Sequence, residues 1–81
     1  MNRQQLINTY ITSDPEILLG KPIIRGTRIP VYLIVGFAET GLTPAEIVDD
    51  YPDLTLEEVE AAIAYGEFLK ERTEIRPRRV G

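Results

Sequence analysis

Cysteine, histidine and tryptophan are absent from the 81 residues of this chain. Without cysteine there is no disulfide framework and no thiolate metal site, which suits a reducing compartment such as the cytoplasm. Without histidine as well, the chain lacks the commonest general bases, nucleophiles and zinc ligands. The sequence therefore predicts a protein that is not an enzyme and that binds no metal or other cofactor.

Long hydrophobic runs are lacking too. The longest mostly apolar run, Ile29 to Ala38, is too short to span a bilayer. The N-terminal sequence MNRQQLINTY contains no apolar signal core. We therefore expect a cytoplasmic protein with no membrane partner.

Basic residues are missing from the middle of the chain. Between Ile29 and Leu69 there are nine acidic residues and no basic one. Residues 1–28 hold four basic and two acidic residues, and residues 70–81 hold five basic and two acidic ones. Because an acidic surface repels phosphate, any contact with nucleic acid would involve the ends of the chain or a dimer.

The short length allows one domain with a small core. A chain of this size buries only roughly 60% of the surface that its unfolded form exposes. The apolar fraction of 43% and the charged fraction of 27% are typical of a globular protein rather than a disordered one. A homodimer, a higher homo-oligomer or a tight partner would add stability to so small a core.

Two segments of the acidic middle carry the same signal for the start of a helix. A threonine followed three residues later by a glutamate forms a capping box, and flanking apolar residues form a hydrophobic staple. Pro44 suits the first position of a helix, and Pro52 closes the first helix after about two turns. The boxes are Thr43 with Glu46 and Thr55 with Glu58, and the staples are Leu42 with Ile47 and Leu54 with Val59.

These signals predict a short helix, a turn and a longer helix from Leu56 to Arg72, the outline of a helix-turn-helix in a mainly α fold. Such an outline is compatible with DNA recognition and with an ordinary helical hairpin. Glu57, Glu58 and Glu60 lie where a recognition helix would meet phosphates, which weighs against DNA recognition. The longer helix has an apolar stripe, assigned to core packing, of Leu56, Val59, Ala62, Ile63, Gly66 and Leu69.

The N-terminal half contains short runs of strand-forming residues. Residues 1–8 are compatible with a short helix or a loose arm. Ile23-Ile24 and Arg28-Ile29 are expected to form two very short strands around a turn at Gly26, where the glycine supplies a positive φ. Such strands need a partner, for which Tyr10-Ile11-Thr12 and another subunit are the candidates.

Three basic residues make this predicted hairpin the basic face of the N-terminal half. They are Lys21, Arg25 and Arg28. One interpretation is contact with DNA phosphates or an acidic partner, and the other is pairing with the acidic helices of the same chain.

After Pro30, the apolar run from Val31 to Ala38 contains β-branched residues that are compatible with a strand, but we expect a helix that ends before Gly41. A helix that is apolar on every side must be buried all round. This indicates either a dimer interface or ordinary core packing. The candidate interface residues are Val31, Ile34, Val35 and Phe37.

The runs GKPIIRGTRIPV and GLTPAEIVDDYPDLTLEEVEAAIAYGE resemble the prokaryotic family called domain of unknown function 433, over roughly residues 10–70. One departure is Leu19, where the family usually has glycine. The resemblance implies a small homeodomain-like helical domain with a short N-terminal β element, often dimeric. It also implies similarity to VapB-type antitoxins, which are frequently partnered with PIN-like ribonuclease toxins.

On this basis we expect a single domain over residues 1–72 and a basic, flexible tail over residues 73–81. The leading hypothesis is an antitoxin that inhibits a PIN-like ribonuclease and represses its own promoter as a dimer. Arginines of the tail could pair with the carboxylates of the nuclease. These arginines are Arg76, Arg78 and Arg79. The alternatives are a DNA-binding regulator without a toxin and a dimerisation or adaptor module.

Overall fold

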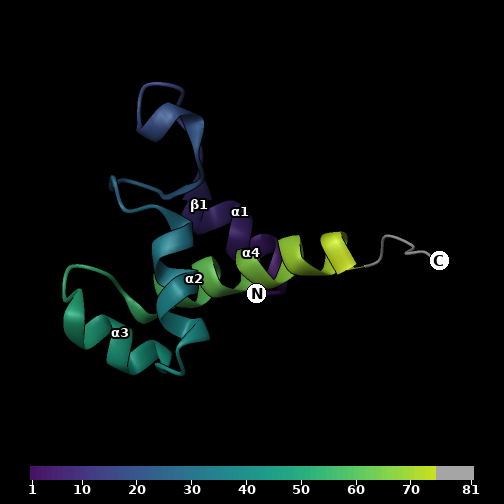
Figure 1. The fold of residues 1–81 in the computed structure, drawn as a ribbon. Coiled ribbons are helices and arrows are strands. Elements are labelled where there is room, and N and C mark those ends of the chain that lie inside the picture. The colour runs from purple at the N-terminus through teal and green to yellow at the C-terminus, as the bar shows by residue number, and fades with distance from the viewer. Residues whose placement is uncertain (75–81) are drawn as a thin grey trace.

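The computed structural model describes residues 1–74 of the chain and shows a mainly α fold, as predicted (Figure 1). A short antiparallel β-hairpin lies near the N-terminus, and helix α4 contacts helices α1, α2 and α3. The elements are α1 (Arg3–Tyr10), β1 (Ile11–Thr12), the 3₁₀ turn η1 (Leu18–Gly20), β2 (Ile23–Ile24), α2 (Val31–Glu39), α3 (Pro44–Asp50) and α4 (Leu56–Glu74).

Both predicted capping boxes are present. The Thr43 hydroxyl accepts a hydrogen bond from the Glu46 backbone N–H at 3.2 Å, and the Glu46 carboxylate accepts one from the Thr43 N–H at 2.8 Å. Thr55 and Glu58 repeat this arrangement at 3.1 and 2.8 Å. Helix α3 ends before Pro52, with Tyr51 as its C-cap. These local signals therefore fix where α3 and α4 begin and where α3 stops.

The core lies between α4 and the elements that cover it. Ile47, Leu54 and Val59 of the predicted staples are buried, whereas Leu56 and Leu69 of the predicted apolar stripe are exposed. Because α4 is covered from several sides, its buried surface is wider than one stripe and includes further alanines. The buried core residues that contact one another are Ile7, Ile11, Ile24, Val31, Ile34, Ile47, Leu54, Val59, Ala61, Ala62 and Ala64.

The β-hairpin differs from the predicted one. Strands β1 and β2 pair in register Ile11 with Ile24 and Thr12 with Ile23, which confirms one of the two expected partners for β2. The prediction of a strand at residues 28–29 was wrong, since only a single bridge joins Ile23 to Pro30. The chain turns at Gly26, whose φ is +82°, and helix α2 begins at Val31, so there is room for only this bridge between the turn and the helix.

The N-terminal segment forms a helix from Arg3 onward and is not a loose arm. Asn2 caps α1 by accepting from the Gln5 N–H at 2.8 Å, and the Gln5 side chain accepts from the Asn2 N–H at 3.0 Å. The Arg3 guanidinium donates to both carboxylate oxygens of Glu71 at 2.8 and 2.9 Å, which ties α1 to α4. This hydrogen bond lowers the pKa of Glu71 and raises the pKa of Arg3.

Helix α4 continues to Glu74, beyond the predicted end at Arg72. Residues 75–81 of the predicted tail, with the candidate toxin-binding residues Arg76, Arg78 and Arg79, lie outside the described residues. None of the helices in residues 1–74 is long and apolar enough to cross a membrane.

Candidate interaction surface

A mostly apolar groove lies between α2 and α4. It has a volume of about 400 Å³, within the range of ligand-holding pockets, about 300–1,000 Å³. Tyr32, at 62% exposed, leaves much of its ring open to solvent. We call this hollow the α2–α4 groove, and it is lined by Lys21, Pro22, Val31, Tyr32, Val35, Gly36, Glu39, Tyr65, Gly66 and Leu69.

The groove exists because the two helices approach closely at one point. Gly66 has no side chain, so Val35 of α2 rests against the backbone of α4 there. Around this contact the larger side chains Tyr32 and Tyr65 line the groove. A glycine inside a long helix makes this shape possible. Glycine at such a position is less favourable than alanine by roughly 1 kcal/mol.

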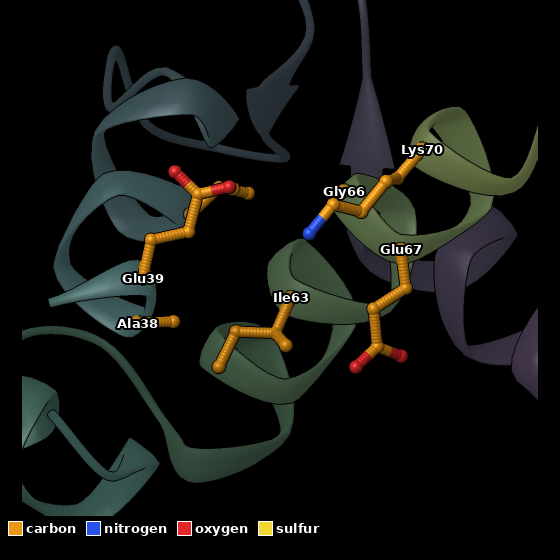
Figure 2. A pocket seen from close by; sticks show the side chains of 7 residues that line it. Ala38, Glu39, Ile63, Gly66, Glu67 and Lys70 are labelled. Carbon is orange, nitrogen blue, oxygen red and sulfur yellow. The ribbon is translucent and has the colours of Figure 1, made fainter. Parts of the chain in front are cut away.

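A second hollow, of about 240 Å³, adjoins the groove and shares Val35, Glu39 and Gly66 with it. Figure 2 shows Lys70 reaching past Gly66 toward Glu39 across the opening, while the Glu67 carboxylate points away from Glu39. The apolar surface between α2 and α4 is therefore bordered by charges of both signs. The surface of α3 and the start of α4, by contrast, carries only acidic charge.

Arg25, predicted to contact DNA, is held against the end of α1. Its guanidinium donates to the backbone carbonyls of Thr9 at 3.0 Å, Asn8 at 3.1 Å and Ile11 at 3.4 Å. The last carbonyls of a helix lack partners within the helix and attract positive charge. Arg25 thus caps α1, a structural role that neither interpretation from the sequence included.

The other two predicted DNA contacts, Lys21 and Arg28, are exposed but lie on different hollows. Lys21 borders the α2–α4 groove, and Arg28 borders a hollow of about 460 Å³ beside Thr12 and Asp14. The structure therefore does not gather the three basic residues in one pocket. Their contact with DNA stays a prediction.

The predicted dimer-interface residues divide into two groups. Val31 and Ile34 are 3% and 0% exposed and are covered by the core of their own chain, so they offer almost no surface to a second copy. Val35 and Phe37 are half-buried, and Phe37 lies against Tyr51 with ring centroids 5.8 Å apart. Tyr32 of the same helix, at 62% exposed, offers more apolar surface than either, and the sequence held this clue because the apolar run includes a tyrosine.

Among the acidic residues of the described range 1–74, no group of three or more potential metal ligands is gathered. At the start of α4, Glu58 serves the cap, while Glu57 and Glu60 are exposed. That end of α4 therefore presents negative charge to anything that approaches it.

Comparison with known proteins identifies a family and similar proteins in two bacteria. The model of the family described as "Protein of unknown function (DUF433)" matches residues 11–66. An uncharacterized protein, y4eO, of Sinorhizobium fredii is 37% identical over 57 residues, which are 70% of this chain and 26% of that protein. This chain thus spans about a quarter of that relative's length. The crystal structure of a DUF433 member protein from Anabaena variabilis has a TM-score of 0.69 and 34% identity, covering 88% of this chain and 70% of that one.

Proposed function

Since this chain belongs to the DUF433 family of proteins of unknown function, we propose its role from its own surface: it is an antitoxin that acts by binding a protein, a PIN-like ribonuclease. The observation that carries the proposal is the acidic start of α4. A helix that reads DNA brings its first turns to the phosphates, and here Glu57 and Glu60 are exposed at that place. The helix pair α3–α4 is therefore suited to a protein partner.

The α2–α4 groove supports the same conclusion. Exposed aromatic side chains in an apolar hollow, bordered by charges, are typical of surfaces that bind proteins. Tyr32 is such a side chain, and Glu39 and Lys21 lie on the border. Such a groove offers a partner both apolar contact and a polar rim.

The class of partner comes from the resemblance to VapB-type antitoxins. PIN-like nucleases gather carboxylates around a metal, and the arginines at positions 76, 78 and 79 could pair with them. The chain would then inhibit the nuclease by occupying the site that metal or RNA needs. A chain ending after Glu74 keeps all of α4 and removes these arginines, so it should fold normally and fail to inhibit.

The experiment is a native pull-down of the tagged chain from its own cells, followed by mass spectrometry. Recovery of a small nuclease in near-equal amount supports the proposal. The chain ending after Glu74 is the matched control and should recover much less of the same nuclease. Recovery of the chain alone, with the cell's DNA intact, would count against an antitoxin.

A second candidate function, repression of its own promoter, is favoured by the exposure of Lys21 and Arg28. Neither side chain forms a hydrogen bond or ion pair within residues 1–74. Replacing both with alanine should flatten the salt dependence of operator binding by about one unit for each phosphate that is no longer neutralised. If neither DNA nor a nuclease is bound, an adaptor or dimerisation module is the function that remains.

A further inference from the structure

The connection between β1 and β2 carries two leucines in an unusual backbone conformation. Leu18 and Leu19 have φ values of +52° and +57°, in the left-handed region that bulky L-residues rarely enter because their Cβ comes too close to the following carbonyl oxygen. Leu19 is 93% exposed and Leu18 is 41% exposed. The chain therefore holds two leucines in a strained conformation without burying them in its own core.

The turn is nonetheless well defined by hydrogen bonds. The Ile17 N–H donates to the Asp14 carbonyl at 2.9 Å, and the Gly20 N–H donates to the Ile17 carbonyl at 3.0 Å. This connection projects from the helical body at the top of Figure 1. We call Leu18 and Leu19 the leucine knob.

The exposure and the strain of the knob are both properties of a contact site. Strained backbone conformations persist where the surrounding structure enforces them, and they cluster at sites that bind or switch. An exposed leucine adds little hydrophobic stabilisation to its own fold, whereas burial by a partner would remove its apolar surface from water. Because hydrogen bonds already fix the turn, such burial would require little further ordering of the chain.

The knob is continuous with the α2–α4 groove, the surface that we assign to the nuclease. Lys21 and Pro22 follow the knob closely in sequence and line the groove. The Val31 N–H at the start of α2 donates to the Pro22 carbonyl at 3.0 Å, which holds this segment to the helix. A stable complex takes about 800 Å² of surface, or roughly 20–30 residues, from each partner. The residues that line the groove are fewer, so a partner seated there must also contact neighbouring surface.

We propose that the leucine knob anchors the chain to the nuclease, with Leu19 inserted into an apolar pocket of the nuclease beside the part that meets the α2–α4 groove. This inference rests on the proposed function, whose partner it adopts, and adds the residue that holds that partner. The knob would supply affinity, while the arginines of the tail would block the active site. The two parts should therefore have separable effects on binding and on inhibition.

The first test measures binding of the purified full chain to the nuclease recovered in the pull-down, by titration calorimetry. Leu19→Asn removes the apolar side chain, and asparagine enters the left-handed region more readily than most residues. It should weaken binding by roughly tenfold or more without lowering the melting temperature of the chain. Leu19→Met is the matched variant, which keeps an apolar side chain of similar volume and should bind nearly as tightly as the unaltered chain.

Inhibition assays then separate the knob from the tail. The Leu19→Asn chain still carries the three tail arginines, so it should inhibit completely at saturation. Half-maximal inhibition should require roughly tenfold more of this variant than of the unaltered chain. The chain ending after Glu74 keeps the knob and should inhibit much less even where its binding is saturated.

A photoreactive amino acid in place of Leu19 identifies what the knob touches. We expect a cross-link to a segment of the nuclease that lines an apolar pocket. A cross-link between two copies of the chain, or a Leu19→Asn chain that binds the nuclease as tightly as the unaltered one, would overturn the knob as an anchor and leave the antitoxin proposal standing. If the unaltered chain itself binds no nuclease, the proposed function fails and the anchor fails with it.

Discussion

A Cβ atom at Gly66 of α4 would lie 2.6 Å from Cγ2 of Val35 in α2. Real side chains do not approach so closely, so these helices meet at a point that only glycine permits in the present packing. The contact sets the spacing of the two helices and with it the shape of the α2–α4 groove. A surface proposed for binding thus depends on one residue that has no side chain.

Gly66→Ala should lower the free energy of unfolding by about 1–3 kcal/mol because the new methyl group overpacks the contact. This loss outweighs the gain of about 1 kcal/mol that alanine brings to a helix. Urea unfolding measures the change. Gly36→Ala is the matched control, since nothing lies within 4 Å of a Cβ at Gly36 in α2, and it should stabilise. Equal effects of the two substitutions would contradict the close contact.

Leu19→Gly should raise the free energy of unfolding of the monomer by about 1 kcal/mol, because glycine adopts a φ of +57° without strain. Leu19→Ala keeps the strain and removes the apolar group, so it should not stabilise. Thermal unfolding at low concentration, where the monomer is measured, separates the two. If alanine raised the free energy of unfolding as much as glycine does, the exposed leucine side chain, and not its backbone strain, would be the cause of the lower stability.

Arg25→Ala should lower the free energy of unfolding by about 1 kcal/mol, because the carbonyls at the end of α1 lose their donor. Arg28→Ala removes the same charge from a side chain with no hydrogen bond within residues 1–74, and its effect should stay within about 0.5 kcal/mol. Denaturant unfolding of both variants tests the assignment of Arg25 as a cap. Equal free energies of unfolding of the two variants would mean that Arg25 does not stabilise the end of α1.

Stability should depend on pH through Glu71, whose pKa is lowered by the hydrogen bond from Arg3. A carboxyl whose pKa is lower in the folded state stabilises the fold above its usual pKa, and this stabilisation disappears as the pH falls through the folded value. Glu71→Gln should therefore lower the melting temperature slightly at neutral pH and not in acid. High salt should reduce the difference, since both side chains are partly exposed.

Glu60→Gln is the control for this pH dependence. It removes an exposed carboxylate on the same helix that has no hydrogen bond or ion pair within residues 1–74. Its effect on the melting temperature should not follow the pH profile of Glu71→Gln. A parallel profile would show that net charge, and not the Arg3–Glu71 pair, governs the response.

Local chemistry in the sequence predicted much of the fold. The two threonine capping boxes and Pro52 marked the ends of α3 and the start of α4, because those hydrogen bonds form between residues three apart. The same rule holds at Asn2 and Gln5, where the weaker pattern of asparagine and glutamine left the start of α1 open. Signals of this kind need no knowledge of the rest of the chain.

Features that depend on distant parts of the chain could not be read in this way. The sequence left the partner of β2 open between residues 10–12 and another subunit, because that partner lies beyond a long connection. Arg25 caps a helix that ends 15 positions before it, and no local pattern marks this role. The groove likewise depends on Val35 meeting Gly66 across two helices. The apolar composition of α2 indicated that this helix must be buried, without saying by what. In the structure, α4 of the same chain covers much of its surface.

The most direct test of the proposed function is an inhibition assay with the ribonuclease recovered in the pull-down. The purified chain is added in increasing amounts while cleavage of RNA is followed. We predict that cleavage falls to background near an equimolar ratio, and that a chain ending after Glu74 inhibits much less. Full nuclease activity in the presence of a large excess of the folded chain would contradict an antitoxin function.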